Sequence, residues 1–144
     1  TADGLLMGTR TGAIDPGVLI ALMRDEGLDA EGLEDLLYRR SGLLGISGLS
    51  SDMRELLASP AAEAAEAVNA YCYQAARYAG SLAVAIGGID AMVFTGGIGE
   101  NAEPVRQKIL AQLSFLGLSA QNVQVVKANE ELTIARHVLS LLRQ

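Results

Sequence analysis

The chain has 144 residues, of which 50% are hydrophobic and 19% are charged. This is the composition of one ordinary globular domain with enough aliphatic side chains for a buried core, and it excludes a disordered tail and a collagen-like chain. Lys and Arg number 11 against 17 Asp and Glu, which gives a net charge of −6. The surface should therefore repel DNA, RNA and acidic membranes, so we expect no nucleic-acid or membrane partner.

The remaining whole-chain features point to a single cytoplasmic unit. The one cysteine, Cys72, excludes an internal disulfide and a cysteine-rich zinc module. No apolar run approaches the roughly 20 residues that span a bilayer, and the start of the chain lacks a signal-peptide pattern. The first residue is Thr1 rather than Met, which indicates processing or a piece of a longer protein. We treat residues 1–144 as one unit because no repeat or long linker divides them.

In the first third of the chain the pattern predicts two capped helices. Residues 1–14 carry glycines and no sustained period, which is typical of a loop. Asp15 followed by proline predicts a helix from Pro16 to the glycine at position 27. Asp29 predicts the cap of a second helix that runs to Arg40.

The middle of the chain predicts a loop followed by the longest helix. Residues 41–50 contain a glycine at every third position, which predicts a loop because glycine weakens helices and strands. A short helix over residues 52–58 follows. Ser59 and Pro60 repeat the cap-plus-proline signal, and apolar residues then keep helical spacing over residues 59–86.

The last third alternates strands with helices. The apolar run at residues 91–95 and the run at 123–127 predict buried strands, and residues 103–114 predict the helix between them, after a glycine loop. A final helix capped by Asn129 should run to Leu142. Such an order implies two parallel strands joined by a right-handed crossover.

Two strands make a poor sheet, because an isolated pair is only marginally stable. Either an early segment such as residues 43–46 pairs with them, or the missing strands belong to sequence that is not present. The sequence alone leaves both explanations open.

The sharpest local signal is the segment Phe94-Thr95-Gly96-Gly97-Ile98-Gly99-Glu100-Asn101. It predicts a strand that passes through a glycine-rich turn into a helix, and such a turn presents backbone N–H groups and the positive end of a helix dipole to a phosphate. No Gly-Lys-Ser/Thr follows, which excludes a Walker loop, and residues 117–124 lack the acidic residue of a dinucleotide site. The glycines could also serve tight packing alone.

Three charged side chains could act beside such a turn, and each also has an ordinary explanation. Arg10 could reach a phosphoryl group or carboxylate with bidentate geometry, or be a surface arginine. Arg54 could stack on a base, or form a salt bridge on its helix. Glu130 follows the last strand, where a carboxylate could hold Mg²⁺, although acidic residues are also common in a first helical turn.

Taken together, these segments resemble the acetokinase family, which comprises acetate, propionate and butyrate kinases. The resemblance covers almost the whole chain and corresponds to the C-terminal part of an acetate kinase. It is carried by five ordered motifs: Met7-Gly8-Thr9-Arg10 with Asp3-Gly4-Leu5 and Asp15-Pro16, Ser41-Gly42-Leu43-Leu44-Gly45-Ile46-Ser47-Gly48, Ser50-Ser51-Asp52-Met53-Arg54, Phe94 to Asn101, and Asn129-Glu130-Glu131-Leu132 with Ile134-Ala135-Arg136.

The resemblance implies an α/β fold, namely the helix-rich C-terminal part of an actin-like ATPase domain (RNase H-like, shared with sugar kinases and heat-shock ATPases), with few parallel strands and an incomplete sheet. It implies reversible Mg²⁺-dependent phosphoryl transfer from ATP to acetate, giving acetyl phosphate and ADP. It also implies a homodimer formed through the C-terminal domain.

The resemblance assigns roles to residues position by position. Arg10 resembles the arginine that stabilises the transition state, and Glu130 resembles the carboxylate that positions Mg²⁺. The nucleotide-binding set comprises a segment that lines the adenosine pocket and a phosphate-binding turn: Asp52, Met53 and Arg54, then Gly96, Gly97, Ile98, Gly99, Glu100 and Asn101.

Family members are much longer than this chain, and their N-terminal domain, which carries the acyl pocket and further catalytic residues, has no counterpart here. We therefore expect half of a nucleotide site and almost no acyl-acceptor site, so the isolated chain should be inactive. The resemblance cannot separate acetate from propionate or butyrate. The alternative hypothesis is a non-catalytic dimerisation module that uses the apolar face of the long helix.

Overall fold

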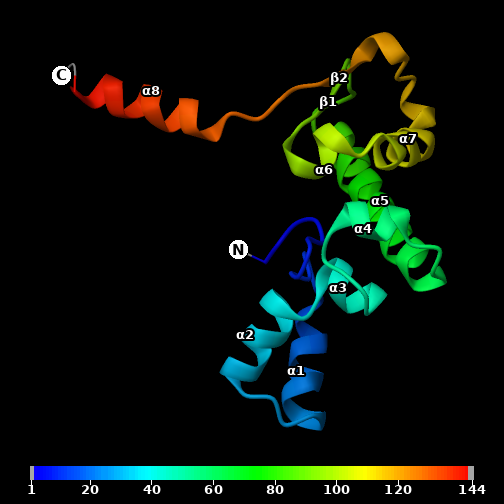
Figure 1. The fold of residues 1–144 in the computed structure, drawn as a ribbon, viewed down its shortest axis with the longest axis vertical. Helices are drawn as coiled ribbons and strands as arrows, with labels where there is room; N and C mark the ends of the chain where they lie inside the picture. Colours follow the sequence, from blue (N-terminus) through cyan, green and yellow to red (C-terminus); the bar gives the residue numbers. More distant parts are fainter. Residues whose placement is uncertain (1, 143–144) are drawn as a thin grey trace.

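The computed structural model describes residues 2–142, apart from the side chains of Ala120 and Glu130. Figure 1 shows an elongated arrangement, with a helical hairpin at one end, two short strands at the other and the long helix α5 between them. The last helix, α8, extends away from the rest of the chain. Along the described residues, no helix combines the length and apolar character that a bilayer crossing requires.

The hairpin consists of α1 (Pro16–Asp25) and α2 (Ala30–Arg39), as the capping signals predicted. The Asp15 carboxylate accepts a hydrogen bond from the backbone N–H of Gly17 at 2.6 Å. The Asp29 carboxylate accepts one from the N–H of Gly32 at 2.9 Å, so both helices begin where the sequence indicated. Neither helix contributes a buried residue to the core.

The prediction of a loop after the hairpin is wrong, because Gly42–Ser47 forms the helix α3. The reason lies far away in the sequence. The backbone N–H groups of Leu43 and Leu44, which a helix leaves without intrahelical partners in its first turn, donate to the carbonyls of Met7 and Gly8 at 2.9 Å. These long-range bonds stabilise a helix that its glycine content disfavours.

Three further helices form the centre of the molecule: α4 (Met53–Ala58), α5 (Ala62–Ala85) and α7 (Glu103–Gln112). The long helix starts slightly later than the Ser59-Pro60 signal predicted. Its cap residue is Ala61, whose N–H donates to the Ser59 hydroxyl at 3.2 Å. The serine thus satisfies a backbone donor just before the helix instead of capping it.

The core is one cluster in which α5 packs against α3, α4 and α7. Its most buried members include Leu43, Met53, Leu56, Ala64, Ala67, Val68, Cys72, Val105, Ile109 and Leu113. The helix predicted from the spacing of apolar residues over 59–86 is confirmed as α5. Val68 and Cys72 of that pattern are buried, whereas Leu82 and Ile86 at its far end are exposed.

The two strands are β1 (Met92–Phe94) and β2 (Val123–Val125), and they pair in parallel as predicted. Met92 lies opposite Val123, and the pairing extends one step further through the N–H of Val126, which donates to the Phe94 carbonyl at 2.9 Å. Within residues 2–142 this pair is the whole sheet. The alternative that residues 43–46 add a strand is wrong, because they lie in α3.

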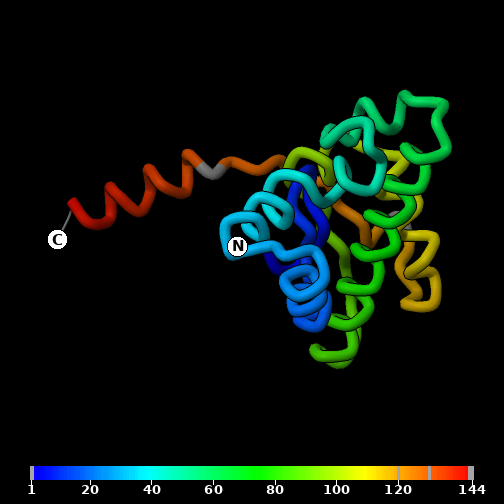
Figure 2. The backbone as a smooth tube through the Cα atoms, turned by 90° about the horizontal axis from the view of Figure 1, so that it is seen from below, coloured from blue at the N-terminus to red at the C-terminus, as the bar shows by residue number. Residues whose placement is uncertain are grey.

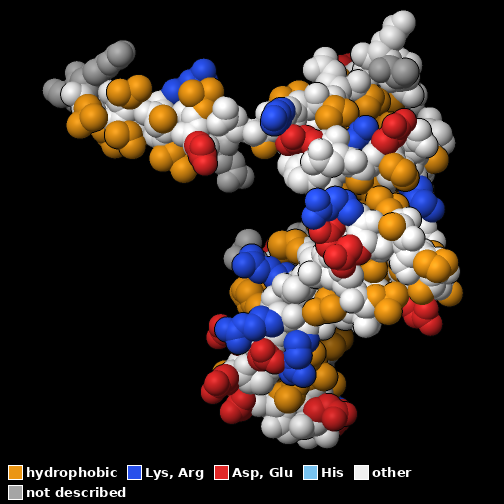
Figure 3. Space-filling view, viewed as in Figure 1, with side chains coloured by type: hydrophobic (Ala, Val, Ile, Leu, Met, Phe, Trp, Pro, Cys, Tyr) orange, Lys and Arg blue, Asp and Glu red, His pale blue; other side chains and the backbone are white. Residues whose placement is uncertain are grey.

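The remaining elements lead to and follow the strands. Helix α6 (Gly96–Asn101) follows β1 directly, and the short 3-10 turns η1 (Ser114–Leu116) and η2 (Ala120–Asn122) precede β2. Helix α8 (Glu130–Leu142) begins after Asn129, whose side-chain oxygen accepts from the N–H of Leu132 at 2.9 Å. Figure 2 shows α8 projecting from the body, and Figure 3 shows hydrophobic side chains on its surface.

Candidate functional site

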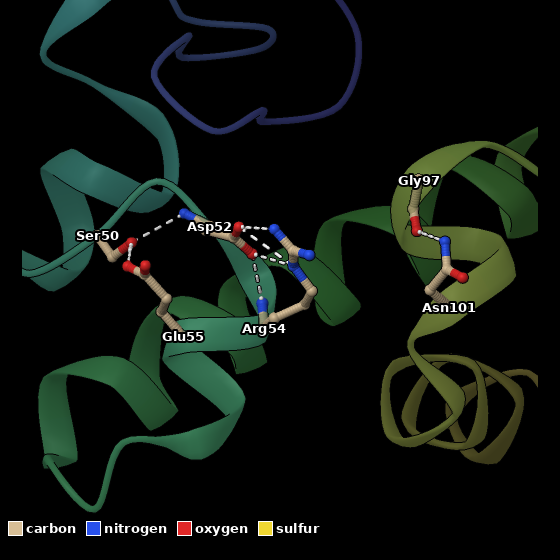
Figure 4. Close-up of polar contacts among 6 residues, drawn as sticks. All are labelled: Ser50, Asp52, Arg54, Glu55, Gly97 and Asn101. Carbon is tan, nitrogen blue, oxygen red and sulfur yellow. Dashed lines mark hydrogen bonds and ion pairs between the residues drawn. The ribbon is translucent and has the colours of Figure 1, made fainter.

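Two of the predicted nucleotide-binding segments line the same cavity. The cavity has a volume of about 650 Å³, which is within the usual range for small-molecule sites. Figure 4 shows the start of α4 on one side and α6 on the other. The lining residues are Ser51, Asp52, Met53, Arg54, Leu57, Gly97, Ile98, Asn101 and Ala102. Two other cavities, of about 450 and 490 Å³, lie around Gln74 and contain none of the predicted site residues.

Asp52 organises the α4 side of the cavity. Its carboxylate accepts from the backbone N–H of Arg54 at 2.8 Å, which caps α4, and it also forms an ion pair with the Arg54 guanidinium at 2.6 Å. These guanidinium and backbone hydrogen bonds from Arg54 lower the pKa of Asp52 from 3.8 to about 2. The Arg54 side chain is 83% exposed and the Asp52 side chain 34%. This side of the cavity therefore carries a solvent-accessible ion pair with no net charge.

The opposite wall differs from the predicted glycine loop, because Gly96–Asn101 is the helix α6. Gly96 has a φ of 74°, which permits the sharp entry from the strand. A β-carbon at Gly99 would lie 3.4 Å from the backbone of Phe94, an ordinary van der Waals distance, so α6 lies directly against the end of β1. Asn101 donates from its side-chain amide to the Gly97 carbonyl at 2.8 Å.

Three members of the predicted set do not line the cavity: Gly96, Gly99 and Glu100. The Glu100 carboxylate is instead engaged within the protein, since one of its oxygens accepts from the backbone N–H groups of Gly96 at 2.9 Å and Ala128 at 2.8 Å. The N–H of Gly96 is thus occupied by a protein carboxylate rather than presented to a ligand.

Arg106, which no sequence motif marks, supports the α6 wall from outside the cavity lining. Its guanidinium donates to the carbonyls of Gly99 at 2.9 Å and Glu100 at 3.0 Å, which are carbonyls at the C-terminal end of α6. A cation at this end of a helix also interacts favourably with the helix dipole. No motif marks this residue, because its role depends only on where α7 places it.

Arg10 lies outside the cavity lining, in the segment that precedes α1. Its guanidinium stands over the ring of Tyr38 at 5.5 Å from the ring centre. The same segment packs beside the cavity wall, since a β-carbon at Gly8 would lie 3.0 Å from the carbonyl oxygen of Ser51. The structure therefore places the Arg10 segment next to the α4 side of the site.

Glu130 begins α8, and its side chain lies outside the described residues. Among the side chains that the structure describes, no three metal-ligating residues gather in one place. Glu130 and Glu131 begin α8, five residues after the end of β2, on the helix that extends away from the sheet (Figure 1), and carboxylates are the protein ligands that suit Mg²⁺. Mg²⁺ commonly takes one or two protein carboxylates, with water and substrate phosphates as the other ligands.

Comparison with known proteins gives a consistent result over the whole chain. A family model described as the acetokinase family matches residues 1–138. An acetate kinase of Rhodopseudomonas palustris strain TIE-1 is 46% identical over 159 residues, which include 96% of this chain and 40% of that protein. The chain therefore spans about two-fifths of the length of the curated relatives that it matches.

Solved structures agree with this assignment. The crystal structure of Porphyromonas gingivalis acetate kinase matches 98% of this chain and 41% of its own with a TM-score of 0.90 and 38% identity. A propionate kinase from Francisella tularensis matches 93% of this chain and 40% of its own with a TM-score of 0.85 and 36% identity. These likenesses confirm the expected fold, a helix-rich part of an actin-like ATPase domain with an incomplete sheet.

Proposed function

The chain belongs to the acetokinase family, and we propose that it provides the nucleotide-binding part of an enzyme that transfers a phosphoryl group reversibly between ATP and acetate, giving acetyl phosphate and ADP. The observation that carries this proposal is the single cavity shared by residues 51–54 and α6. These two segments lie more than 40 residues apart in the sequence, and each was assigned to nucleotide binding on its own motif.

The cavity suits a nucleotide with its nucleoside toward α4. Asp52 offers a carboxylate that can accept a hydrogen bond from a base or ribose, and Arg54 offers a planar guanidinium that can stack on a base. Met53, which is 3% exposed, supports this wall from within the core. Gly97, Ile98 and Asn101 form the facing wall. Gly96 and Glu100 shape this wall by fixing the path of the backbone between β1 and α6.

The proposed chemistry consists of positioning and neutralisation of charge. Phosphoryl transfer needs little covalent chemistry from the protein, and most of the catalysis comes from cations and donors around the phosphates. On this proposal Arg10 stabilises the transferring group through its guanidinium, and Glu130 holds Mg²⁺. When bound, Mg²⁺ would neutralise charge on the phosphate oxygens. A surface of net charge −6 makes such local cations necessary.

We place the acyl acceptor site outside this chain, in agreement with the two-fifths coverage of the relatives. Acetate, propionate and butyrate are then all compatible with these residues. The isolated chain should give no hydroxamate from acetate, ATP and hydroxylamine. Robust turnover by the 144-residue chain would contradict this placement of the acyl site.

Calorimetric titration of MgATP into the chain tests the nucleotide role. Arg54→Ala should weaken binding about two- to tenfold, the effect of losing one hydrogen-bonding side chain. Arg24→Ala is the matched control, because Arg24 also pairs at 2.6 Å with a nearby aspartate but lies on α1. No saturable binding by a folded wild-type chain, or equal effects of the two variants, would refute the assignment.

The Mg²⁺ role is tested in the same titration. Glu130→Ala should make binding less dependent on Mg²⁺, whereas Glu131→Ala, one residue further along α8, should retain the dependence. Equal Mg²⁺ dependence in both variants would contradict the assignment of Glu130.

A second candidate function is an interaction module that dimerises. It is favoured by the exposed apolar end of α5, where Val84 is 82% exposed and Ile86 is 73% exposed. Sedimentation velocity over a concentration series should then show a dimer. A monomer at the highest concentration would exclude this function.

A further inference from the structure

Glu100 joins the two places where the strands of the sheet end. A single carboxylate oxygen of Glu100 accepts from the N–H of Gly96, two residues after the end of β1. The same oxygen accepts from the N–H of Ala128, three residues after the end of β2. Because β1 and β2 are parallel, these two points lie at the same edge of the sheet, the edge at which α/β proteins bind ligands.

The contact continues the sheet where the backbone pairing stops. The last hydrogen bond between the two strand segments runs from the N–H of Val126 to the carbonyl of Phe94 at 2.9 Å. Beyond it the chain turns into α6 on one side and leads to α8 on the other. The Glu100 oxygen therefore adds two charge-assisted hydrogen bonds at the point where the two segments separate, and such bonds are stronger than those between neutral groups.

Contacts from α7 hold the end of α6 that carries Glu100. Arg106 on α7 donates to the carbonyls of both Gly99 and Glu100, so the end of α6 that carries Glu100 is anchored to the next helix. Helix α7 in turn contributes Val105 and Ile109 to the core. The link between the two strand ends is thus connected through α7 to the hydrophobic core.

We propose that Glu100 is a positioning residue that sets the spacing between the α6 wall of the nucleotide cavity and the segment leading to Glu130. This inference rests on the proposed function, because it takes α6 to hold the nucleotide and Glu130 to hold Mg²⁺. Glu100 acts through the backbone of Ala128 and does not touch the nucleotide. Its loss should therefore affect the response to Mg²⁺ more than the binding of ADP alone.

The test combines two measurements on the 144-residue chain, for wild type, Glu100→Ala, Glu100→Gln and Glu103→Ala. Amide hydrogen exchange at Ala128 reports the contact without any ligand. Calorimetry with ADP, with and without Mg²⁺, reports the ratio of the two affinities. Glu103 is the matched control, because it is an exposed carboxylate close by on α7 whose side chain accepts from Gln107 at 3.0 Å. Circular dichroism confirms that each variant is folded.

In Glu100→Ala we expect exchange at Ala128 to accelerate about tenfold or more, the effect of losing a hydrogen bond to a charged acceptor. The Mg²⁺ enhancement of ADP affinity should fall toward onefold, while the affinity for ADP alone stays within about threefold. Glu100→Gln keeps an acceptor oxygen and should recover most of both effects. Glu103→Ala should match wild type.

Three results would overturn the inference. Unchanged exchange at Ala128 in Glu100→Ala would mean that the link is not made in solution. Faster exchange with a wild-type Mg²⁺ enhancement would mean that the link is structural only. If wild type binds no ADP although its Ala128 exchanges slowly, the proposed function fails and this inference fails with it. Slow exchange at Ala128 would then show that the Glu100 contact is made and that nucleotide binding was the wrong premise.

Discussion

Gly42 offers a sharp test of how the fold holds the Arg10 segment. Gly42 begins α3, Gly48 follows its last residue, and both have a φ of 64°, a left-handed conformation that side chains rarely adopt. They differ in their surroundings. A β-carbon at Gly42 would lie 2.2 Å from the carbonyl oxygen of Met7 and 2.8 Å from that of Arg10, whereas a β-carbon at Gly48 would meet nothing within 4 Å.

The expected losses of stability follow from this difference. Gly48→Ala should cost about 1–2 kcal/mol, the strain of a left-handed alanine. Gly42→Ala carries the same strain and also forces the Met7–Arg10 backbone away from α3. That movement breaks three hydrogen bonds of 2.9 Å, donated by the N–H groups of Ser41, Leu43 and Leu44 to the carbonyls of that segment. At about 0.5–1.5 kcal/mol for each bond, the total loss is about 3–6 kcal/mol.

Urea unfolding followed by far-UV circular dichroism measures both variants against wild type. The two unfolding curves should shift to lower urea without a change of slope, and the shift should be clearly larger for Gly42→Ala. Equal shifts would show that left-handed strain is the whole effect. The close packing of residues 7–10 against α3 would then be refuted as a source of stability.

Three further outcomes are expected. Ser47→Ala should cost about 1–3 kcal/mol, because the buried hydroxyl accepts from the N–H of Leu49 at 3.1 Å, and a loss under about 0.5 kcal/mol in urea unfolding would contradict this. Arg54 lowers the pKa of Asp52 from 3.8 to about 2, so the pair stabilises the fold above pH 3.8 and this contribution disappears as the pH falls through 2. In Asp52→Asn the urea midpoint of unfolding should therefore fall less steeply with decreasing pH than in wild type. An unchanged fall of the midpoint at acid pH would contradict the pairing. Burial raises the pKa of the Cys72 thiol, so Ellman's reagent should react with it only after unfolding, and immediate reaction in the native chain would contradict the packing of α5 on α7.

Elements whose stabilising contacts are local could be predicted from the sequence. Asp15 and Asp29 each cap a helix through a backbone N–H two or three residues further along the chain, and both caps were predicted correctly. The parallel strands were also predicted, because a helix between two short apolar runs leaves few other topologies. Helix α3 could not be predicted, since its first N–H groups bond to carbonyls some 36 residues earlier.

The candidate site likewise combines local features that the sequence predicts with long-range packing that it does not. Motifs identified residues 52–54 and 96–101 separately, and only the packing of α4 and α6 around one cavity reveals that they face each other. The density of glycines was interpreted as an open turn that presents N–H groups. In the structure Gly96 instead has a φ of 74° at the entry to α6, and its N–H is taken by Glu100. Glycine spacing alone cannot distinguish an anion site from a sharp turn into a helix.

The ion pair at the start of α4 also limits which part of a ligand that wall can receive. The Arg54 guanidinium already lies 2.6 Å from the Asp52 carboxylate, so a phosphate approaching Arg54 would have to displace a tightly held carboxylate and would meet its negative charge. An uncharged base or ribose meets no such repulsion, and it can stack on the guanidinium plane while the pair stays intact. Under the proposed function, the α4 wall therefore belongs to the nucleoside, and neutralisation of the phosphates is left to Arg10 and to Mg²⁺ at Glu130.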